Sequence, residues 1–319
     1  MKIVAETGNS DLAMVYIADY GSDKLLEFVE AIQPPFLRSE RWILMVSTLF
    51  GCPVKCLICD AGGRFHGKPS KEQILSQIDY MVDKRFPGRE IPCHKFKIQF
   101  ARMGEPALNS NVLGVLTELP KRYKAPGLMP SISTIAPKGS EGFMEQLLDI
   151  KNEFFPNGKF QFQYSIHSTD KDERDRLIPV KKWNFLQLAK FGDRFLRSND
   201  RKITLNFALG SKFSLDENIL LSYFDTDKYL VKITPINPTY QAKKNNIESY
   251  VKDENGNGIK GIISKLKSAG YDVILSIGEL EENLIGSNCG QYVIKHLNNE
   301  EPHINGYSYP IQINEEILL

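Results

Sequence analysis

Residues 41–59 have the sequence RWILMVSTLFGCPVKCLIC, in which an apolar run leads directly into three cysteines. The run at 41–48 is rich in β-branched and aromatic side chains, and this composition predicts a buried β-strand. Cys52, Cys56 and Cys59 follow with the spacing Cys-x3-Cys-x2-Cys. Three thiolates on one short loop can bind three irons of a [4Fe–4S] cubane and leave the fourth iron open to another ligand. The sequence therefore predicts an iron–sulfur site directly after a strand.

A structural zinc site is an alternative for these cysteines. Such a site normally uses four Cys or His ligands, and near the motif His66 is the one further residue of this kind at a suitable spacing. The chain has five cysteines, and an odd number clustered in this way favours metal binding over disulfide bonds. Zinc and a coincidental group of buried cysteines both stay open at this point.

Strand-like and helix-like patterns alternate along the rest of the chain. Strands are expected at 41–48, 95–101, 129–134, 159–167, 202–208, 230–234 and 272–277. Helices are expected at 71–84, 111–119, 140–152, 185–198, 216–223 and 259–269. Ser70 and Gln73 form a capping box at the start of the first helix. The alternation predicts an α/β protein with a parallel sheet, doubly wound or closed into a barrel, whose site lies at the carboxyl ends of the strands.

Charge and hydropathy weaken some functional classes. Lys and Arg number 40, Asp and Glu number 39, and the net charge is +1. No global field therefore attracts a polyanion, which weakens a nucleic-acid-binding hypothesis without excluding it. The longest apolar stretches have about ten residues, whereas a membrane-spanning helix needs roughly 20. Because residues 1–10 also lack the apolar core of a secretory signal, we expect a cytoplasmic protein with no membrane partner.

The cysteine spacing after a first strand resembles the signature of the radical S-adenosylmethionine (SAM) superfamily. This resemblance implies a partial (βα)6 barrel of the TIM type, with SAM as a cofactor beside the [4Fe–4S] cluster. It implies that the open iron chelates the amino and carboxylate groups of SAM. An electron from a reducing partner such as flavodoxin or ferredoxin then breaks a carbon–sulfur bond.

The resemblance also implies a division of the chain. The barrel is expected at 41–295, with a short N-terminal extension at 1–40 and a C-terminal tail at 296–319. Residues 240–258 are rich in Lys, Asn, Asp and Gly, which predicts a mobile loop over the mouth of the barrel.

A second motif, MGEPALN at 103–109, follows the next strand. Gly104 allows the backbone to approach a ligand closely, and Glu105 offers a carboxylate to the ammonium group of SAM. In this position the segment resembles the GEP motif of radical SAM enzymes. An ordinary turn is the other interpretation.

Further segments between residues 42 and 295 resemble the RlmN/Cfr family of RNA adenine methyltransferases. They are SISTI (131–135), YSIH (164–167) with its charged continuation, and PINP (235–238). The resemblance implies SAM contacts at Ser133, Ser165, Ile166, His167 and Asn237. Hydroxyl and amide groups at successive strand ends are suitable partners for a nucleoside.

Residues 285–291, IGSNCGQ, resemble the family segment that contains a methylated cysteine. The resemblance implies that Cys289 accepts a methyl group from one SAM and carries it to the substrate. A second SAM would yield a 5′-deoxyadenosyl radical that abstracts hydrogen from this methyl group. The resulting carbon radical would then add to an adenine of rRNA or tRNA, or to a related heteroaromatic carbon.

Met45 departs from the family pattern. The family releases the sulfur-linked product with a second cysteine, seven residues before the first cluster cysteine, and Met45 occupies that position here. A thioether cannot form the disulfide that this release requires. Cys93 is the only spare thiol of the sequence, and we expect it to be buried. Glu30 loosely resembles the family's catalytic proton acceptor.

Three hypotheses follow. The first is a methyltransferase acting through Cys289 on an RNA adenine or a related heteroaromatic carbon. The second is a paralogue that uses the cluster and SAM for other radical chemistry on a small molecule or peptide. The third is a non-catalytic protein that binds SAM and the cluster.

Overall fold

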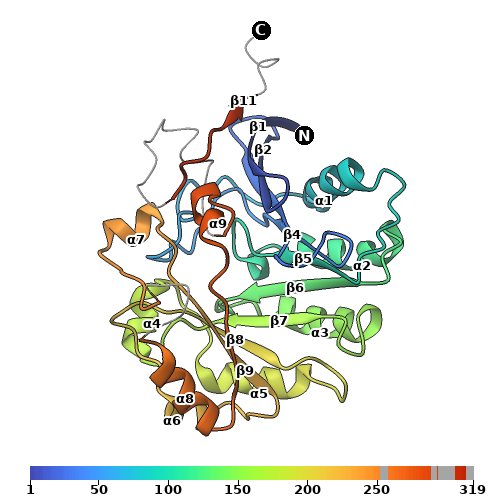
Figure 1. The fold of residues 1–319 in the computed structure, drawn as a ribbon. Coiled ribbons are helices and arrows are strands. Elements are labelled where there is room, and N and C mark those ends of the chain that lie inside the picture. The colour runs from blue at the N-terminus through green and yellow to red at the C-terminus, as the bar shows by residue number, and fades with distance from the viewer. Residues whose placement is uncertain (252–257, 289–292, 294–305, 314–319) are drawn as a thin grey trace. The chain divides into compact units, whose positions relative to one another are not determined.

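The computed structural model describes residues 1–251, 258–288, 293 and 306–313 (Figure 1). It shows a mixed α/β protein with a large, mostly parallel sheet. The chain divides into two compact units. The first unit contains Met1–Pro53, Asp60–Ser131 and Gly278–Leu319, and the second contains Val54–Cys59 and Ile132–Ile277.

The strands of the first unit begin with an antiparallel meander. It consists of β1 (Lys2–Asn9), β2 (Ala13–Asp19), β3 (Leu25–Ala31) and β4 (Arg41–Val46). β5 (Lys95–Phe100) pairs with β4 in the parallel direction, and β11 (Gln312–Ile313) pairs antiparallel with β1. The segment predicted as an N-terminal extension therefore contains three strands, which continue the sheet of this unit.

The helices of the first unit follow the expected signals. They are α1 (Lys71–Arg85), the 3₁₀ turn η1 (Pro106–Leu108), α2 (Asn111–Arg122) and α9 (Leu280–Ile285). The predicted capping box starts α1, because Ser70 accepts from the amide of Gln73 while the side chain of Gln73 accepts from the amide of Ser70. The buried face of α1 includes Ile74, Ile78 and Met81, which recur at helical spacing and pack on β4.

The second unit is built from parallel strands and helices in alternation. Its strands β7 (Gln161–Ser165), β8 (Ile203–Ala208), β9 (Tyr229–Thr234) and β10 (Asp272–Leu275) pair in this order. β6 (Leu128–Thr134) runs from the first unit into the second. The helices are α3 (Glu141–Phe154), α4 (Lys171–Leu177), α5 (Phe185–Phe195), α6 (Glu217–Leu221), α7 (Tyr240–Lys244) and α8 (Lys260–Ser268).

The predicted strands and helices are confirmed within a few residues at their ends. The expected strands correspond to β4–β10, and the expected helices to α1, α2, α3, α5, α6 and α8. The prediction of a loop at 240–258 is wrong at its start, because α7 begins at Tyr240 with Thr239 as its N-cap. Residues 252–257 of that segment lie outside the described residues. The closure of the sheet as a (βα)6 barrel and the boundaries at 41 and 295 stay predictions.

Several strands are buried on one face and partly accessible on the other. Burial alternates residue by residue along β4, β7 and β9. On the less buried side lie Met45 of β4, Ser165 of β7 and Thr234 of β9. Successive side chains of a strand point to opposite faces. In each unit, therefore, the side chains on the less buried face of the sheet are accessible to a ligand.

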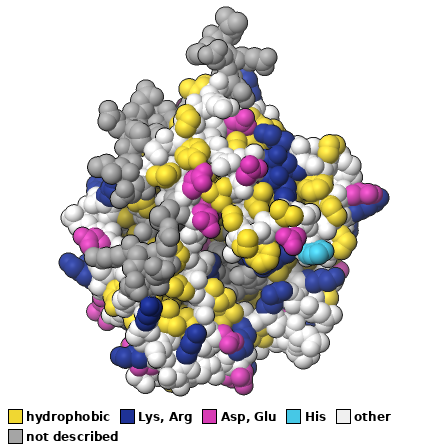
Figure 2. All heavy atoms as spheres, viewed as in Figure 1, with side chains coloured by type: hydrophobic (Ala, Val, Ile, Leu, Met, Phe, Trp, Pro, Cys, Tyr) yellow, Lys and Arg dark blue, Asp and Glu magenta, His cyan; other side chains and the backbone are white. Residues whose placement is uncertain are grey.

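The surface carries charges of both signs. Figure 2 shows Lys and Arg side chains interspersed with Asp and Glu on the face in view, in agreement with the net charge of +1. In the part of the chain that the structure describes, no helix is long and apolar enough to cross a membrane.

Candidate active site

The first unit fixes the start of the cysteine loop at Gly51 and Cys52. Gly51 has a φ of +72°, and a Cβ atom there would lie 2.3 Å from the carbonyl oxygen of Arg64, so only glycine fits. Cys52 is buried, and its carbonyl accepts from the amide of Gly63 at 3.0 Å. The loop therefore folds back on residues 62–64, which holds Cys52 at a defined place.

The second unit holds the rest of the loop by its backbone. The amide of Cys59 donates to the carbonyl of Cys56 at 3.1 Å, and the amide of Leu57 donates to Leu177 at the end of α4 at 3.0 Å. Two side chains of the α7 region also donate to this loop. Asn245 Nδ2 reaches the carbonyl of Leu57 and Thr239 Oγ1 that of Ile58, each at 3.0 Å. The sequence analysis missed both of these positioning residues.

Lys182 brings a buried positive charge to Cys56. Its ammonium donates to Asp175 at 2.6 Å and to the carbonyl of Ile178 at 3.0 Å. Burial lowers the pKa of Lys182, whereas the carboxylate of Asp175 and the Cys56 sulfur act in the opposite direction.

The cysteines have the chemistry that an iron–sulfur cluster needs. Those in the described part of the chain, Cys52, Cys56, Cys59 and Cys93, are thiols and not disulfides. Within the described residues, no three His, Cys, Asp or Glu side chains converge on a metal position. The donor set fits a cluster, and its ligation by Cys52, Cys56 and Cys59 stays a prediction from the motif.

Cys93 is buried, as predicted. It is 1% exposed, and its thiol donates to the carbonyl of Arg38 at 2.9 Å. Burial raises the pKa of this thiol. A buried thiol with a raised pKa is a weak nucleophile, so Cys93 has a structural environment.

Gly104 and Glu105 of the GEP motif lie directly after β5 in the first unit. Gly104 has a φ of +101°, and a Cβ atom there would lie 2.6 Å from the Cβ of Leu49. Glu105 is 5% exposed and accepts from the amide of Ala107 at 3.0 Å, which caps η1. The motif thus forms a tight turn with a buried carboxylate, and its contact with SAM stays a prediction.

The remaining predicted SAM contacts all lie in the second unit, at or just beyond the carboxyl ends of parallel strands. Ser133 is near the end of β6, Ser165 ends β7, and Ile166 and His167 follow it. Asn237 lies just beyond β9, and its carbonyl accepts from the amide of Thr239 at 2.7 Å. Because β7, β8 and β9 are adjacent and parallel, their ends meet at one edge of the sheet, where α/β proteins bind ligands.

His167 is held in a defined tautomer. Its backbone has a φ of +65°, and its Nδ1 accepts from the amide of Ala208 at 3.0 Å. Burial, together with the nearby charge of Arg174, lowers the pKa of His167 to about 4. The ring is therefore neutral near pH 7 and carries its proton on Nε2, where it can act as a hydrogen-bond donor.

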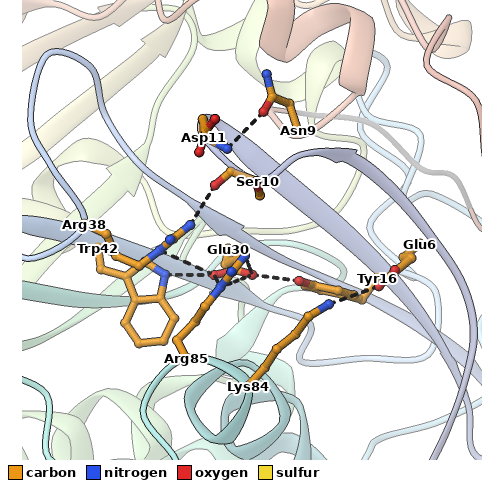
Figure 3. A network of polar contacts seen from close by, with 10 residues as sticks. All are labelled: Glu6, Asn9, Ser10, Asp11, Tyr16, Glu30, Arg38, Trp42, Lys84 and Arg85. Atoms are coloured by element: carbon orange, nitrogen blue, oxygen red, sulfur yellow. Dashed lines mark hydrogen bonds and ion pairs between the residues drawn. The ribbon is translucent and has the colours of Figure 1, made fainter.

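Glu30 lies in a polar network on one face of β3 in the first unit (Figure 3). Arg85 of α1 donates to both of its oxygens at 2.8–3.1 Å. Tyr16 and Trp42 donate to it at 2.7 and 3.1 Å. These contacts tie β2, β3 and β4 to α1 and occupy the carboxylate, and the role of Glu30 as a proton acceptor stays a prediction.

Glu27 lies on the opposite face of β3, because an odd separation reverses the side-chain direction in a strand. Its carboxylate contacts the guanidinium of Arg102 at 2.7 Å. The strand register places Glu27 on the same face as Val29 and its partner Met45. The sequence analysis missed the pair, although a charged residue inside an apolar strand pattern was a visible signal.

Cys289 lies outside the described residues, and its neighbours in the sequence lie in the first unit. Arg102 donates to the carbonyls of Gly286 and Ser287 at 2.9 and 2.7 Å. The amide of Val293 donates to Glu27 at 3.1 Å. The described residues on both sides of Cys289 are therefore bound to Arg102 and to Glu27, and Glu27 shares its sheet face with Met45 of β4.

No protein-family model matches the chain, but individual proteins do. It is 24% identical over 250 residues to a probable dual-specificity RNA methyltransferase RlmN of Petrotoga mobilis, covering 75% of this chain and 68% of that protein. It is 27% identical over 204 residues to such a protein of Pseudothermotoga lettingae, covering 61% and 55%. It is 21% identical over 294 residues to a ribosomal RNA large subunit methyltransferase N of Nitrosopumilus maritimus, covering 89% and 80%. The chain thus spans between about half and four fifths of these relatives.

Solved structures share the fold. A radical SAM methyltransferase from Sphaerobacter thermophilus aligns with a TM-score of 0.70 at 17% identity, covering 91% of this chain and 80% of that one. SuiB of Streptococcus suis, solved with S-adenosylmethionine bound, aligns with a TM-score of 0.51 at 13% identity, covering 76% and 51%. These likenesses support the radical SAM fold.

Proposed function

We propose that this chain, a member of the RlmN/Cfr-like family of radical SAM proteins, methylates an adenine of rRNA or tRNA through Cys289. The observation that carries the proposal is its similarity to RlmN proteins over most of the chain, together with motifs that occur at the strand ends where such sites are built. Other radical chemistry on a small molecule or peptide has no comparable support.

The cysteine motif and the GEP motif would bind the cluster and the amino-acid part of SAM. Cys52, Cys56 and Cys59 would hold a [4Fe–4S] cluster, which with bound SAM supplies one-electron cleavage of a carbon–sulfur bond. An external electron donor such as flavodoxin or ferredoxin is required. Glu105 would bind the ammonium group of SAM, and Gly104 gives the turn that places it.

The polar strand ends of the second unit would bind the nucleoside part of SAM. Ser133, Ser165 and Asn237 offer hydroxyl and amide groups. His167 offers a neutral ring with a donor at Nε2, a state maintained by its low pKa and by the amide of Ala208. Ile166 is buried beside them and would supply apolar contact.

Cys289 would accept the methyl group and carry it to the substrate. Met45, which shares its sheet face with Glu27, stands at the position of the family's resolving cysteine. A methionine cannot be oxidised to a disulfide with Cys289. The proposal therefore requires that the sulfur-linked product be released without a disulfide to position 45.

Anaerobic reconstitution with iron and sulfide tests the cofactor part of the proposal. We expect the wild-type protein to gain iron–sulfur absorption and to form 5′-deoxyadenosine when reduced with SAM. Cys56→Ala removes one iron ligand and should lose most of both signals. Cys93→Ala is the matched control, because Cys93 is a cysteine outside the motif and should leave both signals near the wild-type level. A wild-type protein that binds zinc and forms no deoxyadenosine would contradict the proposal.

Mass spectrometry tests the methyl-transfer part. We expect a mass gain of one methylene unit on the peptide that contains Cys289 when the protein is expressed with SAM available. We also expect methyladenine in RNA incubated with the reduced enzyme. An active enzyme that forms deoxyadenosine but carries an unmodified Cys289 would remove the methyltransferase proposal and leave other radical chemistry.

A further inference from the structure

The Arg102–Glu27 pair is buried within the first unit. The side chains of Arg102 and Glu27 are 2% and 0% exposed. Arg102 follows β5 directly and precedes the GEP turn, whereas Glu27 lies inside β3. A buried ion pair adds little stability compared with apolar side chains of similar size, because both charges lose their hydration. Its presence here calls for a role other than stability.

Arg102 binds the chain on the amino-terminal side of Cys289. Its guanidinium donates to the carbonyls of Gly286 and Ser287 and forms an ion pair with Glu27. Gly286 is the C-cap of α9 and has a φ of +77°. A cation at the carboxyl end of a helix binds the last carbonyls and matches the negative end of the helix dipole. Arg102 therefore fixes where α9 ends and in which direction the chain leaves it.

Glu27 binds the chain on the other side of Cys289. Its second carboxylate oxygen accepts from the amide of Val293 at 3.1 Å. Ser47 donates through its hydroxyl to the carbonyl of Glu27 and accepts from the amide of Met103 at 3.2 Å. The ion pair and the GEP turn are thus joined through a single serine.

We propose that Arg102 and Glu27 are positioning residues for the segment that carries Cys289. This inference rests on the proposed function, in which Cys289 carries the methyl group. It uses the contacts of Gly286, Ser287 and Val293 and the place of Cys289 between them in the sequence. Arg102 holds the chain before Cys289, Glu27 holds it after Cys289, and their ion pair joins the two attachments.

The decisive variant removes both charges at once. Arg102→Met alone would leave Glu27 buried without its cation, which can prevent folding. The double variant R102M/E27Q avoids this, since the amide oxygen of Gln still accepts from Val293 and no charge is left unpaired. Arg122→Met is the matched control, because Arg122 pairs with Asp79 in the same unit and, among the described residues 286–288 and 293, none has a hydrogen bond or ion pair with Arg122 or Asp79.

Two measurements on the reconstituted full chain separate positioning from general structure. The first is the fraction of Cys289 that becomes methylated per cluster bound. The second is backbone hydrogen exchange of a peptide covering residues 284–293. We expect the double variant to lose Cys289 methylation by at least about tenfold, a barrier change of about 1.4 kcal/mol, and to exchange faster in this peptide. Deoxyadenosine formation and cluster content should stay near wild type, and R122M should change neither measurement.

The outcomes distinguish this inference from the proposed function. Methylation and exchange at the wild-type level in the double variant would overturn the positioning role. If wild-type Cys289 is itself not methylated, the proposed function fails, and the exchange measurement still shows whether the pair holds the segment. If the double variant does not fold, Arg102→Lys decides. It keeps the charge but cannot reach the three acceptors together, so intermediate methylation supports the inference and unchanged methylation overturns it.

Discussion

Two buried glutamates three residues apart on β3 have different partners. Glu30 contacts Tyr16, Trp42 and Arg85, all within 55 positions of it in the chain. Glu27 contacts Arg102 and, 266 positions away, Val293. The face of β3 that carries Glu30 therefore contacts residues nearby in the sequence. The face that carries Glu27 contacts residues that are distant in the sequence. Burial and residue type are the same for both glutamates, so the difference lies in the face of the strand.

This comparison changes the interpretation of Glu30. The loose resemblance of Glu30 to the family's catalytic residue predicts a proton acceptor, but a resemblance in sequence does not show which face of a strand a residue occupies. A catalytic carboxylate must be reachable by the proton that it accepts, and Arg85, Tyr16 and Trp42 already contact both oxygens of Glu30. Glu27 is on the face with Met45 and accepts from the amide of Val293. Substitution of Glu30 is therefore expected to have the largest effect among the variants that test this comparison.

Glu30→Ala breaks a buried ion pair, which typically costs about 3–5 kcal/mol of stability. We expect a decrease in the free energy of unfolding near the lower limit of this range, because the arginine keeps some access to water. Arg85 is 21% exposed. Thermal or chemical denaturation of the apoprotein measures this loss. Glu6→Gln is the matched control: it removes the more exposed Glu6–Lys84 pair of the same unit and should cost no more than about 1 kcal/mol.

Glu30→Gln separates structure from catalysis. If Glu30 has only the structural part, this variant loses stability while the folded fraction methylates RNA at the wild-type rate. A variant with wild-type stability, a methylated Cys289 and no methylated RNA would instead support the proton acceptor. Assays should be normalised to cluster content, so that a lower yield of folded protein is not read as slower chemistry.

His167 in the second unit is a partly buried titratable group with a different environment. Glu27 and Glu30 are paired with arginines, whereas His167 has no such partner charge among the described residues and its pKa is lowered to about 4, mainly by burial. In the unfolded chain a histidine has a pKa of about 6.5, so between these values the unfolded chain binds a proton that the folded protein does not. The contribution of His167 to the free energy of unfolding is therefore fully present above about pH 6.5, and it is lost as the pH decreases toward 4.

The expected loss is no more than about 3 kcal/mol, since one pKa unit corresponds to about 1.4 kcal/mol and the ring is only partly buried. Denaturation midpoints between pH 7 and 4.5 measure it. His167→Asn should flatten the pH dependence, and asparagine tolerates the positive φ of this position. The exposed His94 provides the control variant, His94→Asn, which should keep the wild-type slope. An unchanged slope in His167→Asn would show that other groups cause it.

The sequence predicts what is local and misses what is distant. The strands β4–β10 and α1 carry clear periodicity or a capping signal, and the residues predicted to contact SAM occur in short motifs at or just beyond the ends of strands. The partners of Arg102, Thr239 and Asn245 lie 185, 181 and 188 positions away. No pattern within a window of the sequence contains such a pair, so these positioning residues become visible only in the folded chain.

Short elements are missed for a related reason. α4, α7 and α9 have 7, 5 and 6 residues, which is two turns or fewer, so a helical period hardly appears in them. α6 is as short, with 5 residues, and was found because the expected helix at 216–223 is longer than the observed one. The strands β1–β3 were not predicted, because they lie in a segment that does not show the alternation of strands and helices. Their antiparallel pairing onto β4 is nevertheless what buries Glu27 and Glu30 on opposite faces.

Tyr16→Phe is the smallest change that tests the comparison. The hydroxyl of Tyr16 donates to Glu30 at 2.7 Å, and the residue is fully buried, so removing the hydroxyl leaves one carboxylate contact unmade without changing the packing. The expected cost is about 1 kcal/mol. Tyr80→Phe is the control, because the Tyr80 ring packs edge-on against Tyr16 with centroids 5.2 Å apart and its hydroxyl is not part of the Glu30 network shown in Figure 3. If Tyr16→Phe loses no more stability than Tyr80→Phe, the hydrogen bond from Tyr16 to Glu30 makes no measurable contribution of its own. Cys289 methylation should be unchanged in both, since the contacts of Glu27 lie on the other side of the strand.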